Sequence, residues 1–428
     1  MRVALLAAGA AGMVCGSCLR DNRLAATLRE QGRDVSLIPL YTPIRTDEID
    51  ASARRVYFGG INVFLQQKAG FFRGLPRFLD RLLDADWLLR RLRGPGRIDP
   101  RTLGELTVSV LRGEHGLQRK EVERLADALA RGRFDVVNLP NLMFAGVAAH
   151  LRRRLGVPVV CTLSGEDIFL DNLAEPYRAR SFELIRRAAA DIDSYVALTD
   201  YYARHAAGHF GLPRERVETV RMGVRVGDFA AAAPQPAPFT IGYLARICPD
   251  KGLEQLVEAF ILLRSAGRAC RLRVAGWMSA SDAGYLARVR DRLEHAGLAS
   301  QAEFLGEVTR AQKLDLLRSL HVLCVPAPYP EAKGLYVLEA LAAGVPVVLP
   351  DHGSFRELVS GTGGGLLFPP GDAEAAAAAL ARVLDEPGLR GELAQRGRAA
   401  VQQQHTDETM ARSMWALYER VARAGKRP

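Results

Sequence analysis

Two glutamates eight positions apart, Glu331 and Glu339, are the residues of this sequence best suited to chemistry. They enclose a Gly-Leu pair, Gly334 and Leu335, and an apolar segment stands on either side of the whole stretch. This pattern predicts a strand, a loop, a helix that begins near Gly334, and a second strand. The first glutamate then lies in the loop and the second on the helix, about 8 Å along its axis.

The helix N-terminus between these two carboxylates is suited to an anion. The N–H groups of Gly334 and Leu335 have no acceptor inside the helix, and the helix dipole favours negative charge at this end. Carboxylates accept hydrogen bonds from hydroxyl groups. A ligand with hydroxyl groups at both ends and a diphosphate in the middle fits this layout, and a nucleotide sugar is such a ligand.

A second segment supplies the positive charge that a diphosphate requires. Arg246 and Lys251 stand five positions apart, after an apolar run that contains Gly242 and before a helical pattern. Two cations beside a helix N-terminus suit a diphosphate. The alternative is that both are ordinary surface residues at the edge of a domain, but taken together with the pair of glutamates they favour the diphosphate.

Short apolar segments alternate with helical patterns along the chain, which predicts doubly wound parallel sheets. The expected strands are 3–8, 34–39, 135–139, 158–163 and 194–198, then 239–244, 272–276, 322–326 and 345–349. A chain of 428 residues is too long for one ordinary core, so we expect two Rossmann-like domains. Such sheets bind ligands at the carboxyl ends of their strands, which places the expected site in an interdomain cleft.

The expected domain boundaries follow the composition. Residues 1–229 form the first domain and 239–404 the second, with a short Pro/Ala-rich segment between them. Residues 405–428 contain a helix with an apolar face, and a return of this helix to the first domain is one option. Residues 68–133 form a basic helical insertion, interpreted as a solvated excursion over the first domain. The alternative is a surface that contacts anionic lipid or shapes an acceptor pocket.

The composition indicates a globular protein that meets anions, with 48% hydrophobic residues and a net charge of +10. No nucleic-acid-binding signature accompanies the charge, so phosphate-bearing substrates and membrane surfaces rank above nucleic acid. No apolar run reaches the length of a bilayer span, and residues 2–14 are interpreted as a strand and loop rather than a signal peptide. We therefore expect a cytoplasmic protein, with peripheral contact at the inner membrane face as an option.

Neither a metal ion nor another cofactor is predicted. Cys15 and Cys18 form a lone CxxC, for which small residues in a tight turn are a better explanation than a redox or metal role. Asp191 and Asp193 form a DxD pair in a segment where an edge loop is expected. The glycine-rich turn at Gly9 lacks the GxGxxG pattern of a dinucleotide site.

The second half of the chain resembles the family 4 retaining glycosyltransferases, which have the GT-B fold. The resemblance rests on motifs with a specific order and spacing, and it covers nearly all of the second domain. These motifs are Gly242…Arg246…Lys251-Gly252, Val274–Gly276, Phe304–Gly306, Glu331 with Glu339, Leu341–Val348 and Gly364–Asp372. The first half is similar more loosely, through Cys15-Gly16, Gly32–Val35 and Thr162–Asp167.

The resemblance implies transfer of a sugar from a nucleotide-diphospho-sugar to an acceptor, with retention of configuration and assistance from the leaving phosphate. Arg246 and Lys251 would hold the diphosphate, and Glu331 would contact the donor sugar, which makes these three the catalytic residues. Glu339 would bind the ribose hydroxyl groups. The other implied donor-binding residues are Gly242, Val308 near the base, Lys333, Gly334 and Leu335.

The resemblance also implies an acceptor side in the first domain, with Gly16, Ser164 and Asp167. Ser164 replaces the histidine of the family pattern Thr-x-His-Gly-x-Asp, and Lys333 stands inside a motif that is commonly Glu-Gly-Phe-Gly. Lys333 adds a cation that suits an anionic donor or acceptor. The acceptor itself is not identified, and the expected candidates are a sugar, a glycan, a lipid or another small molecule.

Two alternative functions stay open. One is a sugar-nucleotide isomerase or epimerase of the same fold. The other, motivated by Ser164, is a non-catalytic scaffold that binds a nucleotide sugar.

Overall fold

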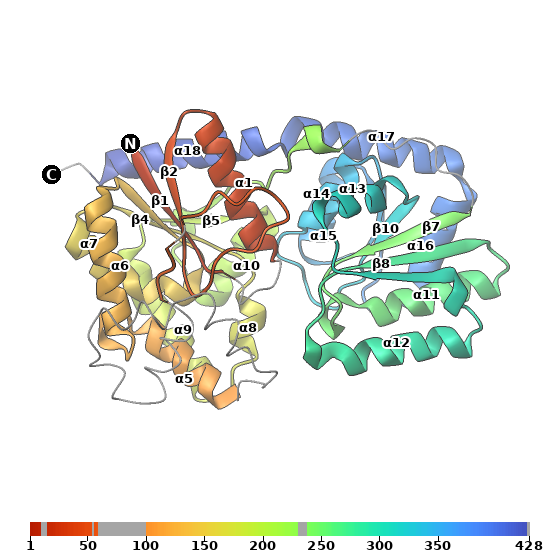
Figure 1. The fold of residues 1–428 in the computed structure, drawn as a ribbon, viewed down its shortest axis with the longest axis horizontal. Coiled ribbons are helices and arrows are strands. Elements are labelled where there is room, and N and C mark those ends of the chain that lie inside the picture. The colour runs from red at the N-terminus through yellow and green to blue at the C-terminus, as the bar shows by residue number, and fades with distance from the viewer. Residues whose placement is uncertain (10–14, 54, 59–99, 230–237, 426–428) are drawn as a thin grey trace. The chain divides into compact units, whose positions relative to one another are not determined.

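The computed structural model describes residues 1–9, 15–53, 55–58, 100–229 and 238–425. The contacts divide the chain into two compact units (Figure 1): unit 1 is Met1–Val220 with Met410–Pro428, and unit 2 is Arg221–Thr409. Each unit contains one six-stranded sheet. Residues 68–99 of the predicted insertion and 230–237 of the predicted linker lie outside the described residues.

The sheet of unit 1 has the strand order β2-β1-β3-β4-β5-β6, and its strands pair in parallel. The strands are β1 Arg2–Ala7, β2 Asp34–Pro39, β3 Val136–Leu139, β4 Val159–Thr162, β5 Ser194–Ala197 and β6 Val217–Thr219. The main helices are α1 Gly16–Glu30, α5 Pro100–Leu111, α6 Arg119–Gly132, α7 Ala148–Leu155, α8 Asp167–Asp171, α9 Tyr177–Ala188 and α10 Asp200–Phe210.

The sheet of unit 2 has the strand order β12-β11-β10-β7-β8-β9, again with parallel pairing. The strands are β7 Phe239–Leu244, β8 Cys270–Ala275, β9 Ala302–Gly306, β10 Val322–Cys324, β11 Val347–Pro350 and β12 Gly365–Phe368. The helices are α11 Leu253–Ser265, α12 Ala283–His295, α13 Arg310–Arg318, α14 Leu335–Ala342, α15 Gly353–Thr362, α16 Ala373–Asp385 and α17 Pro387–Gln404.

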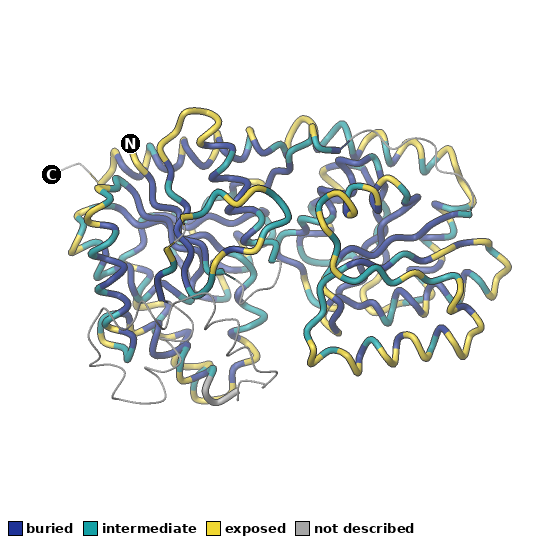
Figure 2. The backbone as a smooth tube through the Cα atoms, in the orientation of Figure 1, coloured by how far each residue is buried: buried dark blue, intermediate teal, exposed yellow. Residues whose placement is uncertain are grey.

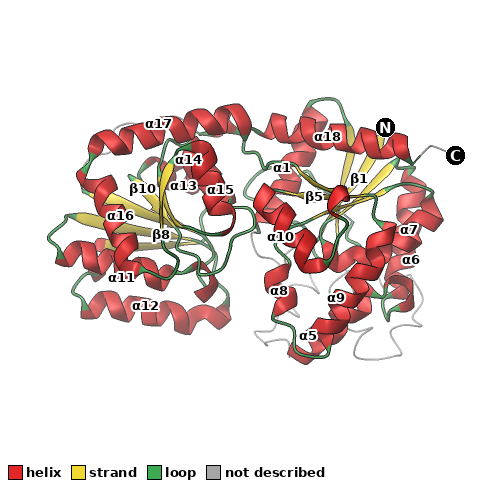
Figure 3. Cartoon of the chain, turned by 180° about the vertical axis from the view of Figure 1, so that it is seen from behind, coloured by secondary structure: helices red, strands yellow, loops and turns green. Residues whose placement is uncertain are grey.

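Helices cover both faces of each sheet, which explains why most residues of the central strands are apolar and buried. In unit 2, Figure 3 shows α11 and α12 on one face and α13, α14 and α15 on the other. All four residues of β11 and all six of β7 are buried, and Figure 2 shows the strands of both sheets as the buried centre of each unit. Several of the polar residues that could do chemistry therefore lie in the loops at the strand ends, among them Arg246 and Glu331.

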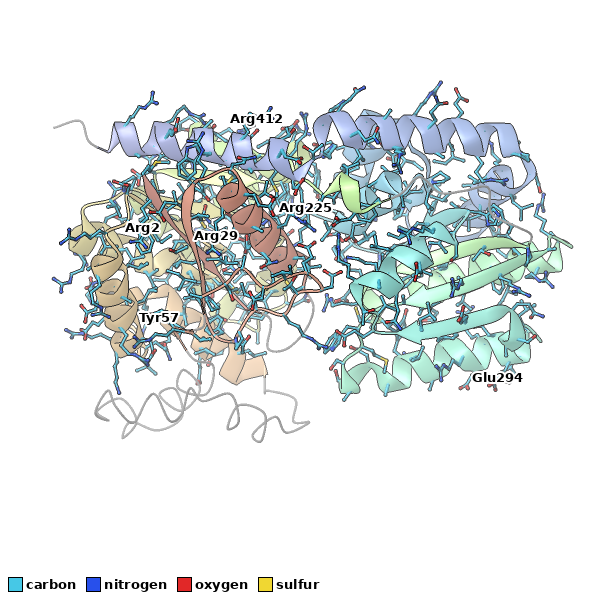
Figure 4. All side chains as sticks on the ribbon, turned by 45° about the horizontal axis from the view of Figure 1, so that its top comes forward. Arg2, Arg29, Tyr57, Arg225, Glu294 and Arg412 are labelled. Carbon is cyan, nitrogen blue, oxygen red and sulfur yellow. The ribbon has the colours of Figure 1, made fainter. Side chains whose placement is uncertain are left out.

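The last helix, α18 (Asp407–Ala424), belongs to both units. Its first residue, Asp407, forms an ion pair with Arg225 within unit 2 (Nε–Oδ2 3.1 Å); Arg225 is labelled in Figure 4. From Met410 the helix belongs to unit 1. There the Tyr418 hydroxyl donates to Oδ1 of Asn138 on β3 (3.3 Å), and the Arg33 guanidinium lies 5.0 Å from the centre of the Trp415 ring. No helix among the described residues is long and apolar enough to cross a bilayer.

Candidate functional site

Unit 2 brings three of the predicted donor residues, Arg246, Lys251 and Glu331, to one edge of its sheet. β7 and β10 are parallel neighbours, so the loops that follow them meet at their carboxyl ends. The loop after β7 carries Arg246 and Lys251, and the loop after β10 carries Glu331. The parallel pairing thus positions residues that are eighty positions apart in the sequence, Lys251 and Glu331, side by side.

Lys251 and Glu331 form a buried ion pair within a group of tyrosines. The Lys251 Nζ lies 2.5 Å from Oε2 of Glu331, and both residues are less than a tenth exposed. The Tyr329 and Tyr336 hydroxyls also lie near this oxygen, at 3.3 and 3.4 Å. The Lys251 Nζ lies 4.8 and 5.7 Å from the centres of the same two rings. Its charge is therefore balanced by the Glu331 carboxylate and by the Tyr329 hydroxyl, to which it also donates a hydrogen bond.

The electrostatics of this group keep Glu331 ionised. Burial raises the pKa of Glu331, but the charge and hydrogen bond of Lys251, with help from Lys333 and Tyr329, outweigh burial and lower the pKa below its usual value. Burial and the Glu331 charge raise the pKa of Tyr329 and of Tyr336 well above the usual value for a tyrosine. Glu331 is thus an acceptor of hydrogen bonds, and the two tyrosines keep their protons as donors.

Arg246 differs from Lys251 because its guanidinium is available to a ligand. It is exposed, and no ion pair links its guanidinium to any residue in the described ranges. Sequence reasoning treats the two cations alike. The geometry separates them, because Lys251 is committed to Glu331 whereas Arg246 can turn to a ligand.

Glu339 has a buried partner that sequence reasoning missed. The Nζ of Lys313 lies 2.6 Å from Oε1 of Glu339, and both side chains are less than a tenth exposed. Lys313 comes from α13, which starts with a capping box at Thr309, one residue after the half-buried Val308. A lysine on a polar helix usually points into solvent, so the sequence carried no signal for this ion pair.

The helix between the two glutamates begins where it was predicted. Gly334 caps α14 with φ 69°, and a Cβ at this position would lie 2.8 Å from the Leu358 side chain. At the start of the helix the Val337 N–H donates to the Gly334 carbonyl (3.1 Å). Within the described residues, the N–H groups of Gly334 and Leu335 have no backbone acceptor. Lys333 is half-buried beside this end of the helix.

Gly242 lies inside β7 rather than at its carboxyl end. It is buried, and a Cβ there would meet the Leu320 side chain at 2.1 Å. The structure therefore explains this glycine by close packing within unit 2, and a direct contact with a donor stays a prediction.

The predicted acceptor-side residues lie in unit 1. Gly16 is the first residue of α1. The Ser164 hydroxyl donates to the Pro140 carbonyl (3.3 Å), and its N–H donates to Oε2 of Glu166 (2.6 Å). Glu166 is a buried residue that sequence reasoning missed, and burial raises its pKa.

Asp167 is held by two side chains of α10. The Tyr202 hydroxyl lies 2.8 Å from its Oδ1 and the His205 Nε2 lies 3.0 Å from its Oδ2. Burial raises the pKa of Asp167, but these two hydrogen bonds outweigh it and lower the pKa. Beside this pair, His209 Nε2 lies 3.1 Å from Oδ1 of Asp171.

His205 and His209 have the i, i+4 spacing of some metal-binding helices, which sequence reasoning overlooked. Each histidine is paired with a separate aspartate, and the described residues contain no group of three side chains that could hold a metal ion. Within the DxD pair, Asp193 has a structural role in unit 1. Oδ2 of Asp193 accepts from the Val159 N–H (2.8 Å) and pairs with Arg152.

Sequence comparisons match both halves of the chain to glycosyltransferases. The family described as "Glycosyltransferase Family 4" matches residues 92–227, and "Glycosyl transferases group 1" matches residues 228–400. The phosphatidyl-myo-inositol mannosyltransferase of Mycobacterium leprae is 32% identical over 306 residues, which are 70% of this chain and 77% of that protein. A lipopolysaccharide core biosynthesis mannosyltransferase of Rhizobium meliloti is 32% identical over 190 residues, 44% of this chain and 53% of that one.

Solved structures share the architecture at lower identity. Sucrose-phosphate synthase from Thermosynechococcus elongatus superposes with a TM-score of 0.73 at 20% identity, over 99% of this chain and all of that chain. HepE from Anabaena in complex with UDP-glucose superposes with a TM-score of 0.67 at 16% identity, over 98% of this chain and all of that chain. With two parallel six-stranded sheets, the motif order of unit 2 and a relative matched over most of its length, the chain belongs to glycosyltransferase family 4 and has the GT-B fold.

Proposed function

We propose that this glycosyltransferase transfers a sugar from a nucleotide-diphospho-sugar to a sugar, lipid or glycan acceptor, with retention of configuration. The observation that carries the proposal is the buried Lys251–Glu331 pair beside the open N-terminus of α14, with the exposed Arg246 on the neighbouring loop. HepE, a structural neighbour, is in complex with UDP-glucose, which supports a donor of this class.

Each donor residue has a separate task in this proposal. The ionised Glu331 accepts hydrogen bonds from donor-sugar hydroxyls, and Lys251 keeps it ionised and in place. The N–H groups at the start of α14 and the Arg246 guanidinium bind the diphosphate. Glu339, oriented by Lys313, accepts from the ribose hydroxyls.

The proposed reaction breaks the bond between the anomeric carbon and the diphosphate oxygen, and the leaving diphosphate takes the electron pair. The acceptor hydroxyl forms the new bond to the anomeric carbon, and its proton passes to the leaving phosphate. The main contribution of the protein is then to stabilise negative charge that develops on the diphosphate. Arg246 and the helix terminus supply that positive charge, while Lys251 holds Glu331 in place, so the proposal includes no metal ion and no other cofactor.

The acceptor side of the proposal rests on unit 1, where Ser164 and Asp167 follow β4. The two mannosyltransferase relatives are named for phosphatidyl-myo-inositol and for the lipopolysaccharide core, and both acceptors belong to lipids. Together with the net charge of +10, this supports an acceptor at an anionic membrane surface and a peripheral, cytoplasmic enzyme.

The experiment is a donor screen followed by transfer assays. UDP-, GDP- and ADP-sugars are tested by thermal shift, and a donor that binds the folded protein raises its melting temperature. With that donor we expect Glu331→Gln and Arg246→Ala to lower transfer by about 10²-fold or more, the usual loss for a group that stabilises developing charge.

The matched control is Glu294→Ala. Glu294 is an exposed glutamate on α12, labelled in Figure 4, and we expect its variant to keep full activity. Full activity in Glu331→Gln or Arg246→Ala would contradict the proposed site. A new sugar nucleotide formed without any acceptor would identify an isomerase or epimerase, and binding without turnover across an acceptor panel would identify a scaffold.

A further inference from the structure

The loop that carries Glu331 has too few internal hydrogen bonds to fix its own conformation. We call residues Val325–Glu331 the Glu331 loop. Three of its seven residues are prolines, at positions 326, 328 and 330, and these have no N–H to donate. Within the loop, the one backbone hydrogen bond among the described residues runs from the Ala327 N–H to the Val325 carbonyl (2.9 Å). Because buried carbonyl groups need donors, the remaining donors must come from other elements.

The turn between β11 and α15 provides these donors. The Nε2 of His352 lies 3.0 Å from the buried Ala327 carbonyl, and since a carbonyl only accepts, Nε2 carries the proton. The Ser354 N–H donates to the Glu331 carbonyl (2.8 Å). Gly353, with φ 56°, lies so close that a Cβ would be 2.6 Å from the Glu331 nitrogen. The turn is therefore fitted directly against the backbone of the Glu331 loop.

A second set of contacts connects His352 with the Glu331 carboxylate. The His352 ring packs against Phe355 with 5.8 Å between ring centres, and Phe355 is fully buried. Phe355 in turn packs against Tyr336, with 6.3 Å between centres. The Tyr336 hydroxyl lies 3.4 Å from Oε2 of Glu331. His352 is thus linked to both the backbone and the side chain of Glu331.

We propose that His352 is a positioning residue of the donor site: its neutral imidazole fixes the Glu331 loop, and thereby the carboxylate that receives the donor sugar. The inference rests on the proposed function for the role of Glu331. In this inference the β11–α15 turn contributes to recognition of the donor sugar and not to recognition of the nucleoside diphosphate. His352 itself contacts neither.

The surroundings of His352 favour its neutral form. Burial lowers the pKa of His352, while the hydrogen bond to Ala327 and the charges of Asp351 and Glu331 oppose that shift without reversing it. Asp351 is paired with Arg356, and Glu331 with Lys251, so neither carboxylate is a dedicated partner for an imidazolium. The His352 Nδ1 is buried and has no hydrogen-bond partner among the described residues. A second proton would therefore place an N–H where no acceptor lies, and acid should loosen the loop.

Two substitutions separate the hydrogen bond from the titration. His352→Gln keeps an N–H donor at the place of Nε2 but does not titrate. His352→Leu removes the donor. The control is His295→Leu, because His295 is exposed and its ring hydrogen bond goes to the Asp291 carbonyl of its own helix.

The first measurement is the affinity for UDP-glucose and for UDP by calorimetry from pH 5.5 to 8, or for the corresponding GDP or ADP pair if that pair binds. For His352→Leu we expect the ratio of the affinity for the sugar nucleotide to the affinity for the nucleoside diphosphate to fall roughly tenfold. This is the size expected for the loss of one hydrogen bond to a buried carbonyl. In the wild type we expect this preference for the sugar nucleotide to decline in acid. His352→Gln should keep the preference at neutral pH and should not show the decline. An unchanged preference in His352→Leu, or the wild-type acid decline in His352→Gln, would overturn the inference.

The second measurement needs no donor. Hydrogen exchange of the backbone amides in residues 325–336, compared at one pH, should be faster in His352→Leu and unchanged in His352→Gln and His295→Leu. Equal exchange in all proteins would refute the positioning role. If the wild type binds no nucleotide sugar, the proposed function fails, and the exchange result still decides whether His352 holds the loop.

Discussion

Among single residues, Lys251 and Glu331 determine the electrostatics of the donor site. A buried carboxylate is costly unless a cation and hydrogen bonds compensate it. Here one cation and two tyrosine hydroxyls meet the same oxygen, Oε2. The pair therefore serves both the stability of unit 2 and the ionised state that sugar binding requires, and the two contributions can be separated by mutation.

Lys251→Met should destabilise the protein by about 3–5 kcal/mol, because it leaves the Glu331 charge buried without its cation. The double variant Lys251→Met with Glu331→Gln should recover part of that loss, since it removes the uncompensated charge. Urea denaturation at pH 7 measures both. If the double variant is less stable than Lys251→Met alone, the pair does not act as described.

The Lys251–Glu331 pair also makes the stability of the folded protein depend on pH, in a direction that follows from the pKa of Glu331. The folded-state pKa of Glu331 lies below its unfolded value of about 4.3. Its ionisation therefore contributes stability that is fully present above that value and is lost as the pH falls through the folded pKa. In Lys251→Met the cation is absent and burial dominates, so the stability gap to the wild type should narrow as the pH is lowered toward 4. A gap that is constant with pH would contradict this assignment.

Among the helices and strands, those with sharp sequence boundaries were predicted well. β2 and β7 have the predicted limits, since Pro39 ends the first of these strands and Pro238 precedes the second. β10 ends at Cys324 rather than at 326, since Pro326 cannot donate to a sheet. α1 begins at Gly16, three residues before its first apolar residue, Leu19.

The partners of the site residues could not be predicted in the same way. Glu331 and Glu339 were found from their spacing on one helix and its loop, which is local information. From other elements of unit 2, Lys313 reaches Glu339 and His352 reaches the Ala327 carbonyl in the Glu331 loop. Their sequence surroundings do not differ from those of a surface lysine or a loop histidine. Such contacts depend on which loops the parallel sheet brings together.

The start of α15 allows a test at the level of one element. Gly353→Ala should destabilise unit 2 and weaken sugar-nucleotide binding, because φ 56° is unfavourable for alanine and its Cβ would press on the Glu331 nitrogen. The matched control is Gly361→Ala on the same helix, where a Cβ meets nothing within 4 Å. That variant should be stabilised by about 0.5–1 kcal/mol, as expected for Gly→Ala inside a helix. Chemical denaturation and donor titration of both variants check this, and equal effects would contradict the close fit at Gly353.

At the scale of the whole molecule, each unit has its own sheet and its own buried core (Figure 2). The predicted donor residues all lie within Arg221–Thr409, whereas the predicted acceptor-side residues lie in unit 1. A ligand that binds the native state of one unit stabilises that unit by mass action. Donor binding and acceptor binding should therefore be visible as separate effects on two cores.

We expect two transitions in calorimetric unfolding, with a nucleoside diphosphate raising the melting temperature of one of them. Gly353→Ala should lower the transition that responds to the nucleotide. Tyr418→Phe should lower the other transition, because it removes the hydrogen bond from α18 to Asn138 inside unit 1. At 100 times Kd the nucleotide should add about 2.7 kcal/mol to the stability of unit 2. A single transition, or a nucleotide response in the transition that Tyr418→Phe lowers, would show that the donor site does not belong to unit 2 alone.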